Sequence, residues 1–299
     1  MSLAGRSLVT IDDLSTDEIE GVFTLAETFE NDVFRQTDVC RGKIMASLFF
    51  EPSTRTRLSF EAAMHRLGGN VIGVSDVKST SLAKGESLSD MARIIGSYAD
   101  IIVIRHPWEG AAKVVADYAG VPVINAGDGG HQHPTQTLLD LYTIKKERHT
   151  LKGLKIALWG DLKYGRTTHS LLFALAKFGA NILFCPSPGL EVPPNVIRKL
   201  ITEYGGDVEL QHEKKSQDIS FPLDAVYMTP SSPHQLAMMP DVNIEVELRK
   251  GVDALYVTRT QKERFSESEK EKNTGHFPII DQQFMKGKEF SKTMVMHPL

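Results

Sequence analysis

Hydroxyl and guanidinium side chains gather in one short stretch of this chain, Ser53-Thr54-Arg55-Thr56-Arg57. The apolar run 44–50 before it predicts a buried strand. Apolar side chains then recur at positions 60, 63, 64 and 67, and Gly68-Gly69 end the predicted helix. The stretch therefore lies at a helix N-terminus, where backbone N–H groups and the helix dipole favour an anion. A lone serine would be an ordinary cap, but three hydroxyls and two arginines indicate a phosphate site.

Apolar strand-like runs alternate with amphipathic helical segments along the whole chain. Strands are expected at about 44–50, 71–75, 100–105, 121–125, 155–160, 181–185, 224–229, 253–258 and 293–297. Helices are expected at about 17–30, 54–67, 86–97, 110–119, 135–148, 166–178 and 194–204. Strands separated by helices form parallel sheets. The predicted fold class is α/β, with two doubly wound parallel-sheet domains (1–134 and 151–292) joined by a long helix (135–150).

Residues that follow the predicted strands carry most of the remaining chemistry. Ligands of open parallel sheets bind outside the carboxyl ends of the strands, so these positions are candidates for one kind of site. They are Arg105, His133, Gln136, Arg166, Arg259, Gln261 and Arg264. His133-Pro134 opens the linking helix, with proline near its first position. Nearby His131 is interpreted as a solvated loop residue.

Composition narrows the class of protein. The 299 residues are 41% hydrophobic and 24% charged, which is ordinary for a globular chain of two domains. A net charge of −4 argues against nucleic acid or an anionic membrane as a partner. Two cysteines, Cys40 and Cys185, give neither a disulfide framework nor a zinc spacing, so a cytoplasmic protein without a metal is expected. The turn 160–166 lacks the spacing of a dinucleotide or P-loop fingerprint, and no cofactor is expected.

Two motifs of this chain resemble those of a known enzyme family. Phe50-Glu51-Pro52-Ser53-Thr54-Arg55-Thr56-Arg57 resembles the carbamoyl-phosphate-binding motif of the aspartate and ornithine carbamoyltransferases, and His133-Pro134-Thr135-Gln136 resembles their His-Pro-Thr-Gln motif. The resemblance implies that His133 contacts the carbamoyl carbonyl and Gln136 the carbamoyl nitrogen. It implies a carbamoyl-phosphate-binding first domain, with the ligands Ser53, Thr54, Arg55, Thr56, Arg105, His133 and Gln136. Thr56, Arg105 and His133 would be the catalytic donors.

The resemblance extends through the second half of the chain. The turn ending at Arg166 is similar to the family's amino-acid-binding turn, and the stretch 256–264 to its second amino-acid-binding element. The resemblance then implies six aspartate-binding residues, which come from a first-domain loop, the second domain and the chain's last segment: Lys84, Arg166, Arg259, Gln261, Pro298 and Leu299. Glu51 and Arg264 would form a latch when the domains close. Residues 293–299 would begin a segment that returns to the first domain.

A Ser/Thr/Lys-rich loop around residues 81–86 would be an ordinary mobile surface loop on composition alone. In the family that it resembles, this loop enters the neighbouring subunit's site, which implies a homotrimer with Ser81 and Lys84 as ligands supplied by a neighbour. A separate regulatory chain is left open as a further partner.

Three features favour aspartate over ornithine as the acceptor: Glu51-Pro52, Thr135, and His297-Pro298-Leu299. Two site arginines also suit a second carboxylate better than an ammonium group. The expected activity is transfer of a carbamoyl group from carbamoyl phosphate to L-aspartate in pyrimidine biosynthesis. An ornithine-type transcarbamylase, an inactive homologue used in assembly and a nicotinamide oxidoreductase are the alternatives. The segment Asp224–Pro230 is a near repeat of Asp253–Arg259, and only the second copy carries Arg-x-Gln.

Overall fold

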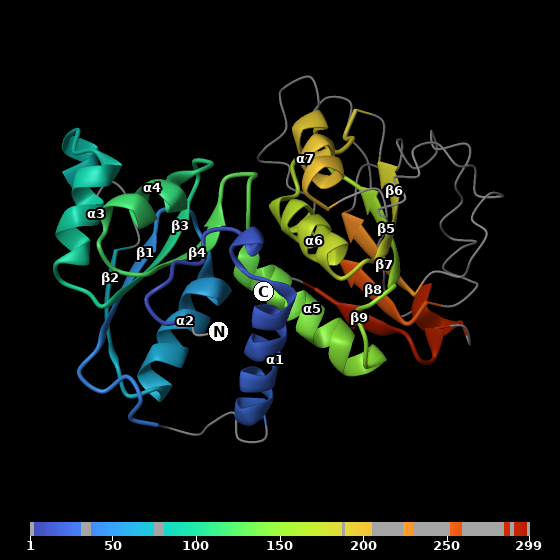
Figure 1. Ribbon diagram of the computed structural model, residues 1–299, viewed down its shortest axis with the longest axis horizontal. Coiled ribbons are helices and arrows are strands. Elements are labelled where there is room, and N and C mark those ends of the chain that lie inside the picture. The colour runs from blue at the N-terminus through green and yellow to red at the C-terminus, as the bar shows by residue number, and fades with distance from the viewer. Residues whose placement is uncertain are drawn as a thin grey trace. The chain divides into compact units, whose positions relative to one another are not determined.

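The computed structural model describes residues 3–30, 37–74, 81–186, 189–204, 224–229, 252–258, 284–287 and 290–297 (Figure 1). The chain forms two compact units, residues 1–139 and residues 140–298. The described elements of the first unit are α1 (Thr16–Glu30), β1 (Ile44–Phe49), α2 (Thr54–Arg66), β2 (Asn70–Val74), α3 (Leu88–Gly96), β3 (Ile101–His106), α4 (Ala111–Tyr118) and β4 (Val123–Asp128). Single 3-10 turns lie at Ile11–Asp13, Ser81–Lys84 and, in the second unit, Phe284–Lys286.

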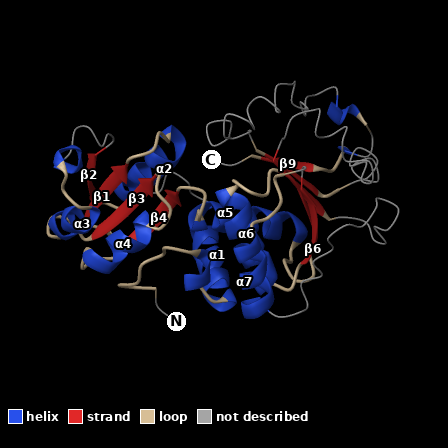
Figure 2. Cartoon of the chain, turned by 90° about the horizontal axis from the view of Figure 1, so that it is seen from above, coloured by secondary structure: helices blue, strands red, loops and turns tan. Residues whose placement is uncertain are grey.

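The first unit is a three-layer sandwich around a parallel sheet of order β2-β1-β3-β4. Alternate side chains of β1 point to opposite faces, as the period of a strand requires. Met45 and Phe49 pack with Met64 of α2 in one core cluster. Ala46 and Leu48 pack on the other face against helices α3 and α4. Figure 2 shows α2 on one side of this sheet and α3 and α4 on the other.

The second unit is built on a parallel sheet of order β6-β5-β7-β8-β9. Its elements are β5 (Lys155–Gly160), α6 (Arg166–Lys177), β6 (Asn181–Pro186), α7 (Pro194–Tyr204), β7 (Ala225–Thr229), β8 (Ala254–Val257) and β9 (Met294–Met296). Helices α6 and α7 pack on each other, and α6 also contacts β6. Apolar side chains of α6, including Leu172 and Phe173, are buried.

The repeated segment of the sequence is explained by this second sheet. Its two copies are the neighbouring parallel strands β7 and β8, paired in register so that Tyr227 lies beside Tyr256. The two rings stack with centroids 4.2 Å apart and an interplanar angle of 13°. Asp224 and Asp253, one residue before each strand, both form ion pairs with Arg148. The repeat therefore encodes two equivalent strands of one core.

Helix α5 (Pro134–Arg148) is continuous from the end of the first unit into the second. Each described strand and α-helix begins and ends within three residues of its predicted range, with β4 extending furthest beyond it, to Asp128 rather than 125. The predicted fold class, two parallel-sheet α/β domains with a linking helix, is confirmed. Within the described parts of the chain, none of the helices combines the length and apolar character that a membrane span requires.

Candidate active site

The predicted phosphate turn is the direct connection from β1 to α2. Ser53 occupies the N-cap position with extended backbone angles (φ −160°, ψ 94°), but its side chain makes no capping hydrogen bond. The side-chain oxygen of an ordinary serine cap accepts a hydrogen bond from a backbone N–H of the first helical turn. The alternative that this serine is only a cap is therefore not supported. Thr54 and Arg55 are exposed on the same turn, so hydroxyls and a guanidinium face solvent at the positive end of α2.

Arg57, the second arginine of the motif, is used inside the fold. Its Nε donates to Glu61 Oε1 at 2.7 Å, one turn further along α2. The Ser47 hydroxyl of β1 donates to the same oxygen at 2.9 Å. Glu61 thus joins α2 to β1 and holds Arg57 against the helix, whereas Arg55 is the arginine of this turn that is exposed.

Arg105 and Glu51 lie at the carboxyl ends of neighbouring strands, because Phe49 pairs in register with Arg105. The Nε atom of Arg105 is 3.2 Å from Glu51 Oε2, and both side chains are largely buried (12% and 22% exposed). Arg105 also donates to the Ala126 carbonyl at 3.4 Å. Sequence reasoning proposed both residues as functional but did not anticipate that they pair with each other.

A cavity of about 270 Å³ brings three predicted ligands together in the first unit. Its walls are residues of α2 and of the start of α5, namely Thr56, Ser59, Phe60, Ala63, His133, Thr135, Gln136 and Leu139. Thr56, His133 and Gln136 are each 5% exposed or less. Thr56 Oγ1 is buried and has no hydrogen-bond partner among the described residues. A desolvated hydroxyl facing a cavity is a donor that a ligand can use.

His133 is held at the N-cap of α5, since its carbonyl accepts the Thr137 N–H at 3.2 Å. Its Nδ1 lies 3.4 Å from Thr135 Oγ1. Five residues before it lies the fully buried Asp128, the last residue of β4, which sequence analysis missed. His131 is a loop residue with 41% of its side chain exposed, as expected, but its Nδ1 also lies 3.1 Å from Asp128 Oδ2. The sequence did contain a signal for Asp128, because a carboxylate that directly follows an apolar strand and precedes two glycines is a candidate for a buried turn residue.

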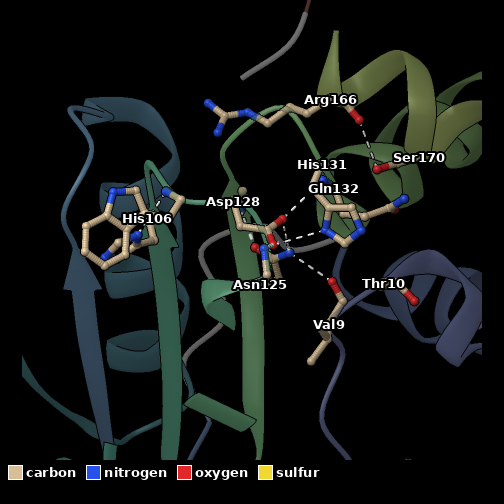
Figure 3. Close-up of polar contacts among 12 residues, drawn as sticks. Val9, Thr10, His106, Asn125, Asp128, His131, Gln132, Arg166 and Ser170 are labelled. Atoms are coloured by element: carbon tan, nitrogen blue, oxygen red, sulfur yellow. Dashed lines mark hydrogen bonds and ion pairs between the residues drawn. The ribbon is translucent and has the colours of Figure 1, made fainter. Parts of the chain in front are cut away.

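Arg166 is the first residue of α6, as predicted, and is only 6% exposed. Asp161 shapes the turn before it, since its Oδ1 accepts the N–H groups of Lys163 at 3.1 Å and Tyr164 at 2.9 Å. The Arg166 carbonyl accepts the Ser170 hydroxyl at 3.1 Å (Figure 3). The turn thus places an arginine at the carboxyl end of β5, where parallel sheets bind ligands.

Some predicted site residues fall outside the described residues: Arg259, Gln261, Arg264, Pro298 and Leu299. Thr258, the residue before Arg259, is described, buried, and lies directly after β8. Ser81 and Lys84 begin and end one 3-10 turn, and Lys84 is exposed. In the described ranges, no group of three or more His, Cys, Asp or Glu side chains could hold a metal ion.

Comparisons with known proteins show which enzyme family this chain belongs to. The carbamoyl-phosphate-binding domain of the aspartate/ornithine carbamoyltransferases matches residues 6–146, which contain the phosphate turn and the cavity. The catalytic subunit of aspartate carbamoyltransferase from Thermococcus kodakarensis is 45% identical over 302 residues, covering 100% of this chain and 86% of the relative. The one from Thermoplasma acidophilum is 43% identical, covering 99% and 87%. The chain belongs to the aspartate carbamoyltransferase catalytic subunit family.

Solved structures agree with this assignment. The catalytic subunit of aspartate transcarbamoylase from M. jannaschii superposes with a TM-score of 0.72 at 43% identity, covering 98% of this chain and 86% of that chain. Aspartate transcarbamoylase from Trypanosoma cruzi, in complex with carbamoyl phosphate and aspartate, has a TM-score of 0.76 at 34% identity, covering 99% and 86%. The family resemblance predicted from the two sequence motifs is confirmed.

Proposed function

We propose that this protein transfers the carbamoyl group of carbamoyl phosphate to the amine of L-aspartate, which gives N-carbamoyl-L-aspartate and phosphate. The observation that carries the proposal is the convergence of Thr56, His133 and Gln136 on one cavity beside the phosphate turn. The T. cruzi relative has been seen with both substrates and, in another structure, with carbamoyl aspartate and phosphate. This reaction would be a step of pyrimidine biosynthesis.

In the proposed mechanism, a neutral amine attacks the carbamoyl carbon and negative charge develops on the carbonyl oxygen. Thr56, Arg105 and His133 stabilise that oxygen as donors that are already in place. Phosphate leaves while Ser53, Thr54 and Arg55 hold it at the N-terminus of α2. Gln136 orients the carbamoyl nitrogen. The steps balance without a covalent intermediate: one C–N bond forms, one C–O bond breaks, and the proton that the amine loses passes to the departing phosphate.

The second unit supplies most of the residues for aspartate in this proposal. Arg166, which α6 presents after β5, binds one carboxylate. Arg259 and Gln261, which follow the described end of β8, bind the other, with Lys84, Pro298 and Leu299 completing the amino-acid site. Charge-assisted, bidentate arginine contacts account for a preference for a dicarboxylic amino acid over ornithine.

The test is steady-state turnover of carbamoyl phosphate by the purified protein with L-aspartate and, separately, with L-ornithine. Carbamoyl-aspartate formation that depends on L-aspartate, at least about a hundredfold faster than with ornithine, supports the proposal. Faster turnover with ornithine would show that the protein is an ornithine-type transcarbamylase. If the protein binds carbamoyl phosphate but turns over neither amine, it is an inactive homologue.

We also propose a cytoplasmic homotrimer in which Ser81 and Lys84 of one subunit enter the site of the next. The exposed position of Lys84 on a 3-10 turn is compatible with such an exchange. A ring of three requires a heterologous interface, with different surfaces of each chain in contact. Sedimentation velocity measures the assembly, and a monomer at assay concentration contradicts it. A separate regulatory chain is compatible with this arrangement.

A further inference from the structure

Asp128, the last residue of β4, is a carboxylate with 0% exposure in the middle of the loops that carry the predicted ligands (Figure 3). Four donors converge on its two oxygens. Oδ1 accepts from Asn125 Nδ2 at 2.8 Å and from the Gln132 N–H at 3.1 Å. Oδ2 accepts from the Gly110 N–H at 2.9 Å and lies 3.1 Å from His131 Nδ1. An ionised carboxylate has the lone pairs for four such contacts, and no neutral side chain does.

The backbone closes the same loop. The Asp128 N–H donates to the Gln132 carbonyl at 3.2 Å, and the His131 N–H donates to the Asp128 carbonyl at 3.0 Å. Gly129 within the loop has φ +53°, and a Cβ atom there would lie 2.6 Å from Glu109 Cγ and 3.0 Å from the Pro107 carbonyl. Residues 128–132 therefore form a compact turn that ends one residue before His133.

Asp128 also joins this turn to the loop that follows Arg105. Gly110, whose N–H binds Oδ2, is the N-cap of α4 and adopts φ +79°. The Gly129 N–H donates to the His106 carbonyl at 2.9 Å, which makes a second link between the two loops. Asn125 Nδ2 extends the network to the Val9 carbonyl at 2.9 Å. One buried carboxylate thus ties together the strand ends that carry Arg105 and His133.

We infer that Asp128 is a positioning residue that orients His133 and the first turn of α5 toward the carbamoyl group. It does not touch the substrate, since it is fully buried and is not part of the cavity wall. The inference rests on the proposed function, because it assigns to Asp128 the support of a donor that acts on the carbamoyl oxygen. Such support matters, because a catalytic group that is displaced by about 1 Å can lower the reaction rate by about 10²-fold.

The test is Asp128→Asn, which keeps the side-chain shape but turns an NH2 group toward two donors. The kcat with aspartate should fall about a hundredfold, while the KM for carbamoyl phosphate rises less than about tenfold because Ser53, Thr54 and Arg55 keep their places on α2. The matched control is Asp224→Asn. Asp224 also accepts a backbone N–H and pairs with a cationic side chain, but it lies at the amino end of β7 rather than at the carboxyl end of a strand. This control should lower the melting temperature and leave kcat unchanged.

Two further measurements separate positioning from general damage. In a His133→Ala background, Asp128→Asn should lower kcat by less than about threefold, because the group through which it acts is gone. In NMR spectra of protein with 13C-labelled histidine rings, the His133 signal, assigned by its loss in His133→Ala, should shift in Asp128→Asn and not in Asp224→Asn. A full additive loss in the double variant, or an unmoved His133 signal, overturns the inference. A wild-type protein that turns over no amine refutes the proposed function instead, and the NMR result then still decides the positioning role.

Discussion

The Glu51 carboxylate and the Arg105 guanidinium form an ion pair at the carboxyl ends of β1 and β3, with Oε2 3.2 Å from Nε. Both residues are predicted to act on the substrates, Arg105 as a donor to carbamoyl phosphate and Glu51 as a latch. Their pairing means that the positive charge of Arg105 is partly neutralised before an anion arrives. In the proposed function, carbamoyl phosphate therefore competes with Glu51 for this guanidinium or shares it.

Glu51→Gln tests that competition. Loss of the carboxylate should leave the dissociation constant for carbamoyl phosphate unchanged or lower it by up to about fivefold, because Arg105 becomes more available to the anion. Turnover with aspartate should fall, since the latch that the family resemblance assigns to Glu51 is removed. Isothermal titration and steady-state kinetics measure the two quantities. The exposed Glu27→Gln on α1 is the control. Weaker carbamoyl phosphate binding in Glu51→Gln would contradict the competition.

Thr56→Val should raise stability and lower activity. The buried Thr56 hydroxyl has no partner among the described residues, so its replacement by a methyl group removes an unsatisfied polar group and should raise the free energy of unfolding by about 1 kcal/mol. The proposed oxyanion donor is lost at the same time, and kcat should fall about 10²-fold or more. Urea unfolding and kinetics measure the two effects.

A matched control for this variant is Thr137→Val. The Thr137 hydroxyl is also buried and without a partner in the described part of the chain, but it is not in the cavity wall. Thr137→Val should show the gain in stability without the loss of turnover. Similar kinetics for the two variants would show that Thr56 has no special role.

The strands and helices could be predicted closely because the period of apolar residues changes at each element boundary, as at the passage from β1 to α2. The hydroxyl-rich helix start selected Thr56, and the strand-end rule selected His133 and Gln136. The structure brings all three to one cavity. Pairings between residues distant in sequence could not be predicted in this way. Glu51 and Arg105 are 54 positions apart, and Asp128 and Gly110 are 18 apart. Such contacts depend on strand order and register, which local pattern does not contain.

His106 should make stability depend on pH. Burial lowers the pKa of its imidazole below the ordinary value of 6.5, against the opposing charges of Asp128 and Glu51. Its Nδ1 accepts the Trp108 N–H at 3.0 Å, and a proton on Nδ1 would break that bond. Below pH 6.5 the unfolded chain therefore takes up this proton first. The stability contribution is complete above that pH and is lost as pH falls through the lower folded-state pKa.

His106→Asn provides the measurement, since the Asn oxygen can still accept the Trp108 N–H but does not titrate. Urea unfolding at about pH 7.5 and about pH 5 should show a smaller pH-dependent loss of stability in the variant than in the wild type. The comparison uses the difference between the two pH values, so a general cost of the substitution cancels. An equal or larger pH-dependent loss in His106→Asn would assign the effect to other groups.

Mixed trimers test whether the site is shared between subunits. Arg55→Ala should lower turnover about 10²–10³-fold through the loss of a phosphate donor, whereas the exposed Arg41→Ala should be neutral. Lys84→Ala should also be inactive, because the proposed site draws this lysine from a neighbour. When the two inactive proteins are dissociated and reassembled together, a site that takes Arg55 from one chain and Lys84 from another becomes intact in about one case in four for an equal random mixture. Turnover should therefore recover to about a quarter of the wild-type value. Mixed trimers that are verified by mass spectrometry and stay inactive would place Lys84 in its own chain's site, or outside the site altogether.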